Sequence, residues 1–150
     1  MLVAALSWGS LSAQTLEKVF QNYLEVKNSL VDGNSSAASA NASLLVSSVE
    51  ELAQKGTESK GQKSILPEIT SLAKAISTSN QLEQQRAGFG KLSESIWSLI
   101  KEDDSFTLPA YYTYCPMKKT HWISEFANIK NPFYGKQMLS CGKVESTINQ

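Results

Sequence analysis

The stretch LEKVFQNYLEVKNSLVDG, residues 16–33, decides the fold. Its apolar side chains recur three and four positions apart, a spacing that lines one face of an α-helix. They are Leu16, Val19, Phe20, Tyr23, Leu24, Leu30 and Val31. Gly33 follows as a stop signal, because a residue without a Cβ readily takes the left-handed conformation that ends many helices. The stretch therefore predicts an amphipathic helix with one buried face.

Three further segments repeat this spacing. In chain order their stripes are Ala38, Ala42, Leu45, Val49 and Leu52; Ile65, Ile69, Leu72 and Ile76; and Leu82, Phe89, Leu92, Ile96 and Leu99. Ser64 is the expected N-cap of the third helix and Pro67 fits its first turn, while Asn80 with Glu83 predicts a capping box for the fourth. Short connections favour antiparallel neighbours. The predicted fold class is all-α, an up-down four-helix bundle over residues 15–102.

The composition changes after Pro109. Residues 109–142 hold four of the five Tyr, both Cys, two of the three Met and the only His. We expect an irregular Cys/Met/aromatic tail that packs on the bundle, within one helical domain over residues 15–150, and no segment that alternates like a strand. Gly88 and Gly90 each cost a helix about 1 kcal/mol relative to Ala. Either they allow close packing of two helices or they leave space for this tail.

Residues 1–14, MLVAALSWGSLSAQ, are apolar and uncharged and end in small residues. They are too short to span a membrane, which takes about 20 apolar residues. They resemble the hydrophobic part and cleavage zone of a secretory signal whose basic start is missing. We therefore expect a truncated signal peptide and a periplasmic or otherwise exported mature chain without a membrane span. The alternative is an additional apolar turn that packs on the domain.

Charge and motif content argue against two function classes. Lys plus Arg and Asp plus Glu each number 14, so no basic excess supplies the phosphate contacts of a nucleic-acid-binding protein. The sequence contains no zinc-protease helix, phosphate-binding glycine loop or nucleophile elbow. Its single histidine leaves acid-base chemistry poorly supplied. We expect no enzyme activity and no nucleic-acid partner.

The tail does carry soft-metal ligands. Cys115, Met117, His121, Met138 and Cys141 combine thiol, thioether and imidazole groups. Thiolate and thioether ligands favour Cu(I), and imidazole also accepts copper and zinc. These five residues are the candidate metal ligands, with copper as the expected ion. The pattern lacks the paired short spacings of structural zinc sites.

The two cysteines have a second interpretation. In an oxidising compartment Cys115 and Cys141 can form a disulfide, which would stabilise the fold by about 3 to 4 kcal/mol. The tail would then be a structural or protein-interaction element without metal. The sequence leaves both interpretations open.

The tail also carries a resemblance. YCPM at 114–117, a Trp shortly after it, and NPFYGKQMLSCG at 131–142 resemble a bacterial exported domain family of unknown function described as heavy-metal-binding. The likeness extends to YLEVKNSLVDG at 23–33 and QQRAGFGKLSESIW at 84–97. It implies a periplasmic, mostly helical domain, alone or appended to adaptor subunits of metal-efflux systems. The matching tail positions are Tyr114, Cys115, Pro116, Met117, Trp122, Asn131, Pro132, Tyr134, Gly135, Met138, Cys141 and Gly142. Phe133 departs from the usual Tyr, and His121 is not part of the family pattern.

Overall fold

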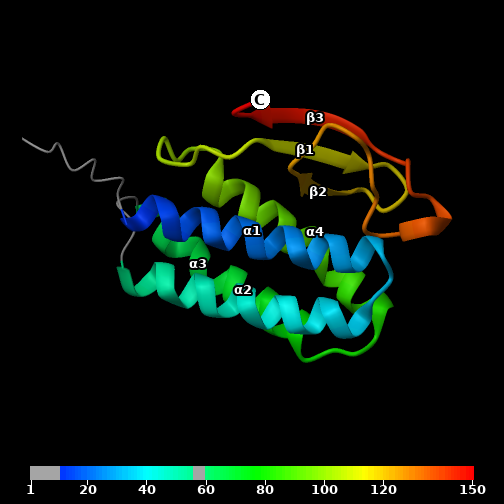
Figure 1. The fold of residues 1–150 in the computed structure, drawn as a ribbon, viewed down its shortest axis with the longest axis horizontal. Helices are drawn as coiled ribbons and strands as arrows, with labels where there is room; N and C mark the ends of the chain where they lie inside the picture. The colour runs from blue at the N-terminus through cyan, green and yellow to red at the C-terminus, as the bar shows by residue number, and fades with distance from the viewer. Residues whose placement is uncertain (1–10, 56–59) are drawn as a thin grey trace, which may run out of the picture.

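Four helices form a bundle in which each helix packs against the next one along the chain (Figure 1). The computed structural model describes residues 11–55 and 60–150. The helices are α1 (Leu11–Val31), α2 (Ser35–Lys55), α3 (Lys60–Ser77) and α4 (Leu82–Ile100). The predicted up-down bundle is confirmed as the helical part of the fold.

The end of α1 is as predicted from the sequence, but the starts of α3 and α4 differ from the prediction. Gly33 has a φ of 70°, and the Asn34 N–H donates to the Ser29 carbonyl at 2.9 Å, as expected for a glycine stop. Helix α3 begins at Lys60, so Ser64 is not its N-cap and Pro67 lies inside it. The N-cap of α4 is Gln81, which makes no side-chain capping bond, so the predicted capping box is wrong.

The all-α prediction is wrong, because the tail contains a three-stranded antiparallel sheet. Its strands are β1 (Ala110–Cys115), β2 (Thr120–Ser124) and β3 (Lys143–Ile148), in the order β2-β1-β3. Tyr and Thr dominate β1, and such side chains suit a pleated, half-buried surface better than a helix. Between β2 and β3 the chain remains irregular apart from the short 3-10 helix η1 (Gly135–Gln137).

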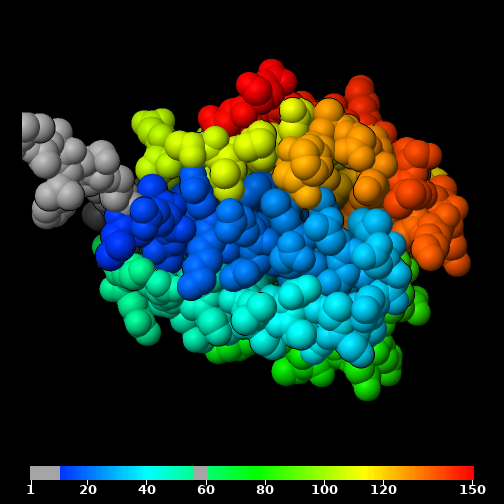
Figure 2. All heavy atoms as spheres, viewed as in Figure 1, coloured from blue at the N-terminus to red at the C-terminus, as the bar shows by residue number. Residues whose placement is uncertain are grey.

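The sheet lies over α1 and α4, on the side of the bundle away from α2 and α3 (Figure 1). Figure 2 shows the C-terminal third in direct contact with α1. A Cβ at Gly90 would overlap Thr120 Oγ1 and lie 2.9 Å from Thr120 Cγ2. Gly88 instead faces Ile76 of α3, 3.9 Å from where its Cβ would be. Gly90 therefore makes room for the sheet, and Gly88 lies at a helix-helix contact.

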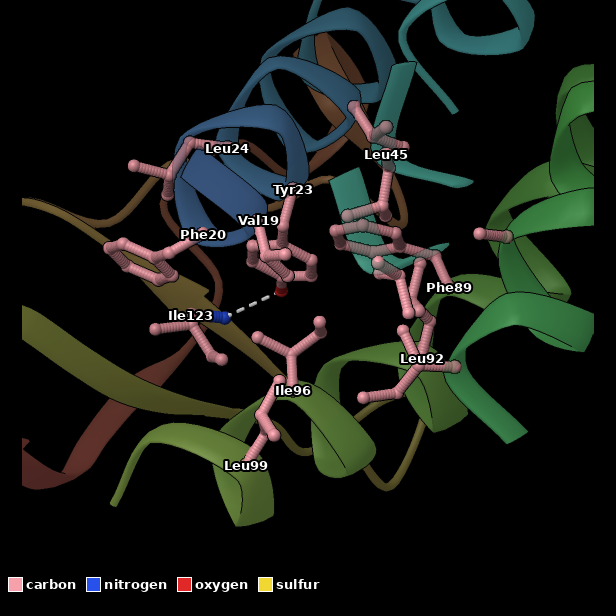
Figure 3. Close-up of a cluster of buried hydrophobic side chains, with 14 of the residues drawn as sticks. Val19, Phe20, Tyr23, Leu24, Leu45, Phe89, Leu92, Ile96, Leu99 and Ile123 are labelled. Atoms are coloured by element: carbon pink, nitrogen blue, oxygen red, sulfur yellow. Dashed lines mark hydrogen bonds between the residues drawn. The ribbon is translucent and has the colours of Figure 1, made fainter. Parts of the chain in front are cut away.

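One core joins the bundle to the sheet (Figure 3). The predicted stripes supply most of it, and Ile123 of β2 is fully buried among them. The Tyr23 hydroxyl accepts a hydrogen bond from the Ile123 backbone N–H at 2.9 Å. Bundle and tail therefore fold around shared side chains, since α1 satisfies a backbone donor of the sheet.

The predicted signal segment falls mostly outside the described residues. Residues 1–10 are not described, and residues 11–14 belong to the first turn of α1. The signal peptide and the export of the chain stay predictions. Within residues 11–55 and 60–150, no helix combines the length and apolar character needed to cross a membrane.

Candidate metal centre in the C-terminal tail

The sheet register separates the predicted ligands. Cys115 of β1 pairs with Thr120, and the neighbouring pair is Tyr114 with His121. Paired residues of an antiparallel sheet project to the same face, and successive residues alternate between faces. Cys115 and His121 therefore project to opposite faces of the sheet. The structure does not bring His121 to the cysteines.

His121 belongs to an aromatic stack. Its ring lies parallel to Tyr112 at 4.3 Å and tilted against Tyr114 at 5.0 Å. Tyr112 in turn stacks on Trp97 of α4 at 4.7 Å. His121 Nε2 lies 2.8 Å from Glu145 Oε2 of β3. This imidazole already has a hydrogen-bond partner and ring neighbours, which gives it a structural role across the three strands.

The two cysteines meet at one side chain. Cys115 and Asn131 are both fully buried. Asn131 Nδ2 donates to Cys115 Sγ at 3.2 Å and to the Cys141 carbonyl at 2.7 Å. Both cysteines are free thiols, and Cys141 is partly exposed. The amide of Asn131 therefore holds a buried thiol and the backbone of a partly accessible cysteine side by side.

Asn131 is fixed by bonds on its other atoms. Its Oδ1 accepts the N–H groups of Phe133 at 2.8 Å and Tyr134 at 3.3 Å. Its backbone N–H donates to the Leu139 carbonyl, and its carbonyl accepts the Gly135 N–H. An Asn before a Pro commonly starts a turn by bonding to the backbone that follows. We call residues 131–141 the Asn131 turn.

The glycines of the tail are needed for close packing. Gly135 has a φ of 55°, a left-handed conformation that favours glycine, and a Cβ there would lie 2.7 Å from Arg86 Nη2. A Cβ at Gly142 would lie 2.5 Å from Cη2 of the buried Trp122. The Trp122 ring also meets Phe133 edge to face, with centroids 6.1 Å apart. Much of the recognisable tail motif therefore builds the turn and its contact with the sheet.

Arg86 ties the Asn131 turn to the bundle. From α4, its Nε donates to the Pro132 carbonyl and its Nη2 donates to the Leu30 carbonyl, each at 2.8 Å. The arginine therefore bridges the end of α1, helix α4 and the turn. Sequence periodicity did not single it out, because it lies outside the apolar stripe of α4. The Asn-Pro dipeptide was the signal that could have pointed to Asn131.

The two methionines lie in different surroundings. Met117 lies in the turn between β1 and β2 and is 59% exposed. Met138 is partly buried, and its carbonyl accepts the Cys141 N–H at 3.1 Å. Over the described part of the chain, no three His, Cys, Asp or Glu side chains gather as a metal-binding group. Of the five predicted ligands, the two cysteines share a contact with Asn131, and each has a methionine close to it in sequence.

Comparison with known proteins gives one match. A family model described as "Protein of unknown function (DUF3347)" matches residues 19–107, more than half of the chain. No curated protein and no solved structure matches significantly. The matched segment contains most of the bundle and ends before β1. The cysteines and the Asn131 turn lie beyond it.

Proposed function

The chain belongs to the DUF3347 family of proteins of unknown function, and we propose that it binds a soft metal ion through Cys115 and Cys141. Copper as Cu(I) is the proposed ion, because thiolate and thioether ligands favour it over harder cations. The chain then acts as an exported carrier, sensor or efflux accessory, with a metal-efflux adaptor or another periplasmic protein as partner. The proposed export rests on the apolar segment at residues 1–14. The proposed partner rests on the resemblance of the tail motifs to the exported domain family.

One observation carries the metal assignment. A single nitrogen, Asn131 Nδ2, is within hydrogen-bond distance of both Cys115 Sγ and the Cys141 carbonyl. The sequence places these cysteines 26 positions apart, and the tail folds them onto one buried amide. A pair of thiolates is a suitable ligand set for Cu(I), which accepts low coordination numbers. The shared contact with Asn131 supports these two cysteines as the proposed ligand pair.

The surrounding residues have separate roles in this proposal. Asn131 Nδ2 donates to the Cys115 sulfur, so Asn131 fixes the position of this proposed ligand. Met138 and Met117 are the auxiliary ligands, since each is close in sequence to one cysteine. His121 was a predicted ligand but is held by Glu145 and its neighbouring rings, so the proposal leaves it out.

The test is an anaerobic titration of reduced protein with Cu(I) against a competing chelator. We expect one Cu(I) per chain, loss of tight binding in Cys115→Ser and Cys141→Ser, and weaker binding in Met138→Leu or Met117→Leu. His121→Gln is the matched control and should bind as the parent does. Metal binding should also release protons, because thiols must lose them to become ligands. A double Cys→Ser variant that binds Cu(I) as tightly as the parent would refute the proposal.

A second candidate is a structural tail closed by a Cys115–Cys141 disulfide. The contacts of Asn131 with both cysteines also favour this disulfide. Metal ligation and a disulfide are competing states of the same two sulfurs. A free-thiol count on protein purified from its native compartment separates the two. Two free thiols with bound copper support the metal site. No free thiol, no metal and a loss of about 3 to 4 kcal/mol of stability on reduction support the disulfide.

A further inference from the structure

A cleft lies between α4 and the tail, separate from the cysteine pair. Its volume is about 650 Å³, within the range of about 300 to 1,000 Å³ that small-molecule sites usually occupy. Ala87 and Gly90 line it along α4, and Phe133 and Tyr134 line it from the Asn131 turn. Thr120 fills the space beside Gly90, so the room for an apolar group lies between Ala87 and the aromatic residues of the turn.

Two cations that line the cleft, Arg86 of α4 and Lys118 of the tail, lack an acidic partner. Arg86 donates to the carbonyls of Pro132 and Leu30, which are neutral. Lys118 lies over the Tyr134 ring, with Nζ 5.3 Å from its centroid. No carboxylate within the described ranges lies at ion-pair distance from either group. Both cations are therefore anchored at residues 132–134 with their charge uncompensated.

Partial burial makes the Arg86 charge costly. Removal from water disfavours the charged form, and burial lowers the pKa of Arg86 below its ordinary value. The guanidinium stays protonated all the same, because its pKa starts so high. A partly desolvated cation without a counter-ion is a favourable partner for an anion that enters the cleft.

The other charges of the cleft limit what can bind. Lys91 adds a third cation, but Glu68 lies 4.0 Å away from it. Glu83 and Glu94 also line the cleft and would repel a molecule with several negative groups. The cations without an acidic partner are thus Arg86 of α4 and Lys118 of the tail. A ligand with one anionic group and an uncharged body suits this distribution.

We propose that the cleft binds a small organic anion, a carboxylate or phosphate attached to an apolar body, with Arg86 and Lys118 as partners of the anionic group. The apolar body lies along Ala87 and the aromatic residues of the turn. This site is independent of metal binding by the cysteines.

The probes are benzoate and phenyl phosphate, with benzyl alcohol as the uncharged control. Titrations followed by the backbone amide signals of Gly90 and Thr120 should show saturable shifts with a dissociation constant of about 1 mM or tighter for at least one anion. The anion that binds better identifies the headgroup. Benzyl alcohol should bind at least about tenfold more weakly, since a charge-assisted hydrogen bond contributes about that factor or more. Equal binding of the alcohol, or no saturable shift with either anion, would overturn the proposal.

Charge variants supply the second test. Lys118→Gln should weaken the binding of the better anion about tenfold, since it removes a charge-assisted contact. Lys63→Gln on α3 changes the net charge equally but lies away from the cleft. This variant should bind the anion as tightly as the parent does. Glu83→Gln removes a repulsive charge and should tighten binding. Arg86 is not used, because its loss would also release Pro132 and Leu30. Equal effects of the two lysine variants would contradict the assignment.

Discussion

Replacing Tyr23 by Phe tests the contact that joins the bundle to the sheet. Tyr23 is fully buried, and its hydroxyl lies 2.9 Å from the Ile123 N–H and 2.6 Å from Ser93 Oγ. Ser93 Oγ donates to the Phe89 carbonyl at 2.8 Å, so the Tyr23 hydroxyl donates to Ser93 and accepts from Ile123. Tyr23→Phe keeps the ring and its stack on Phe89, and removes only the oxygen.

The expected cost follows from the groups left behind. The Ile123 N–H is buried, and an unsatisfied buried donor costs about 1 to 3 kcal/mol. Ser93 Oγ also loses the hydrogen that Tyr23 donates to it, a bond that contributes about 1 kcal/mol. Tyr23→Phe should therefore lower the free energy of unfolding by about 2 to 4 kcal/mol. Burial also raises the Tyr23 pKa well above its usual value, so the hydroxyl stays a neutral donor.

Urea unfolding followed by circular dichroism measures this change. Tyr111→Phe in β1 is the matched control, because its ring is partly exposed and its hydroxyl has no hydrogen-bond partner in the described part of the chain. It should change stability by less than about 0.5 kcal/mol. Hydrogen exchange adds a local readout, since the Ile123 amide should exchange faster in Tyr23→Phe. An unchanged unfolding free energy with an unchanged Ile123 amide would refute the shared-core reasoning.

Two further predictions concern backbone space and buried charge. Gly90→Ala should destabilise the fold by about 1 to 3 kcal/mol, because its Cβ would overlap Thr120. Gly88→Ala should be neutral or stabilising by up to about 1 kcal/mol, and equal thermal unfolding of the two variants would contradict this. Lys27 pairs with Glu125 at 2.5 Å, and burial lowers the Lys27 pKa although this partner opposes the shift. Glu125→Gln should cost about 3 to 5 kcal/mol at neutral pH. The unfolded chain holds the Lys27 proton more tightly than the folded chain, so the free energy of unfolding of this variant should rise as the pH increases towards 10.5. A free energy of unfolding that falls as the pH approaches 10.5 would refute the lowered pKa of Lys27.

The helical bundle could be predicted from sequence because its signal is local and repeated. Each stripe places apolar side chains at a fixed spacing, and positions such as Val19, Leu45 and Ile96 are fully buried as expected. Helix starts were less predictable. Asn80 and Ser64 have the right chemistry for a cap, but α3 begins before Ser64 and the N-cap of α4 is Gln81.

The sheet was missed because its strands show little of the period-two pattern. Tyr111 and Tyr112 are adjacent and both partly exposed, so β1 does not alternate between buried and exposed positions. Its aromatic and Thr content, between Pro109 and the turn that contains Pro116, was the available signal. The candidate site depended on the sheet. Without its register, nothing in the sequence separates His121 from Cys115.

The tail motif has two explanations, and the structure assigns different residues to each. Asn131, Gly135 and Gly142 are required by hydrogen bonds and by close contacts, whatever the tail binds. Cys141 and Met138 are not explained in this way, because they are partly exposed and their hydrogen bonds are made by backbone atoms. A motif shaped only by folding would not need sulfur at those two positions. The metal hypothesis therefore depends on these sulfur side chains, and variants of the turn residues would report on folding.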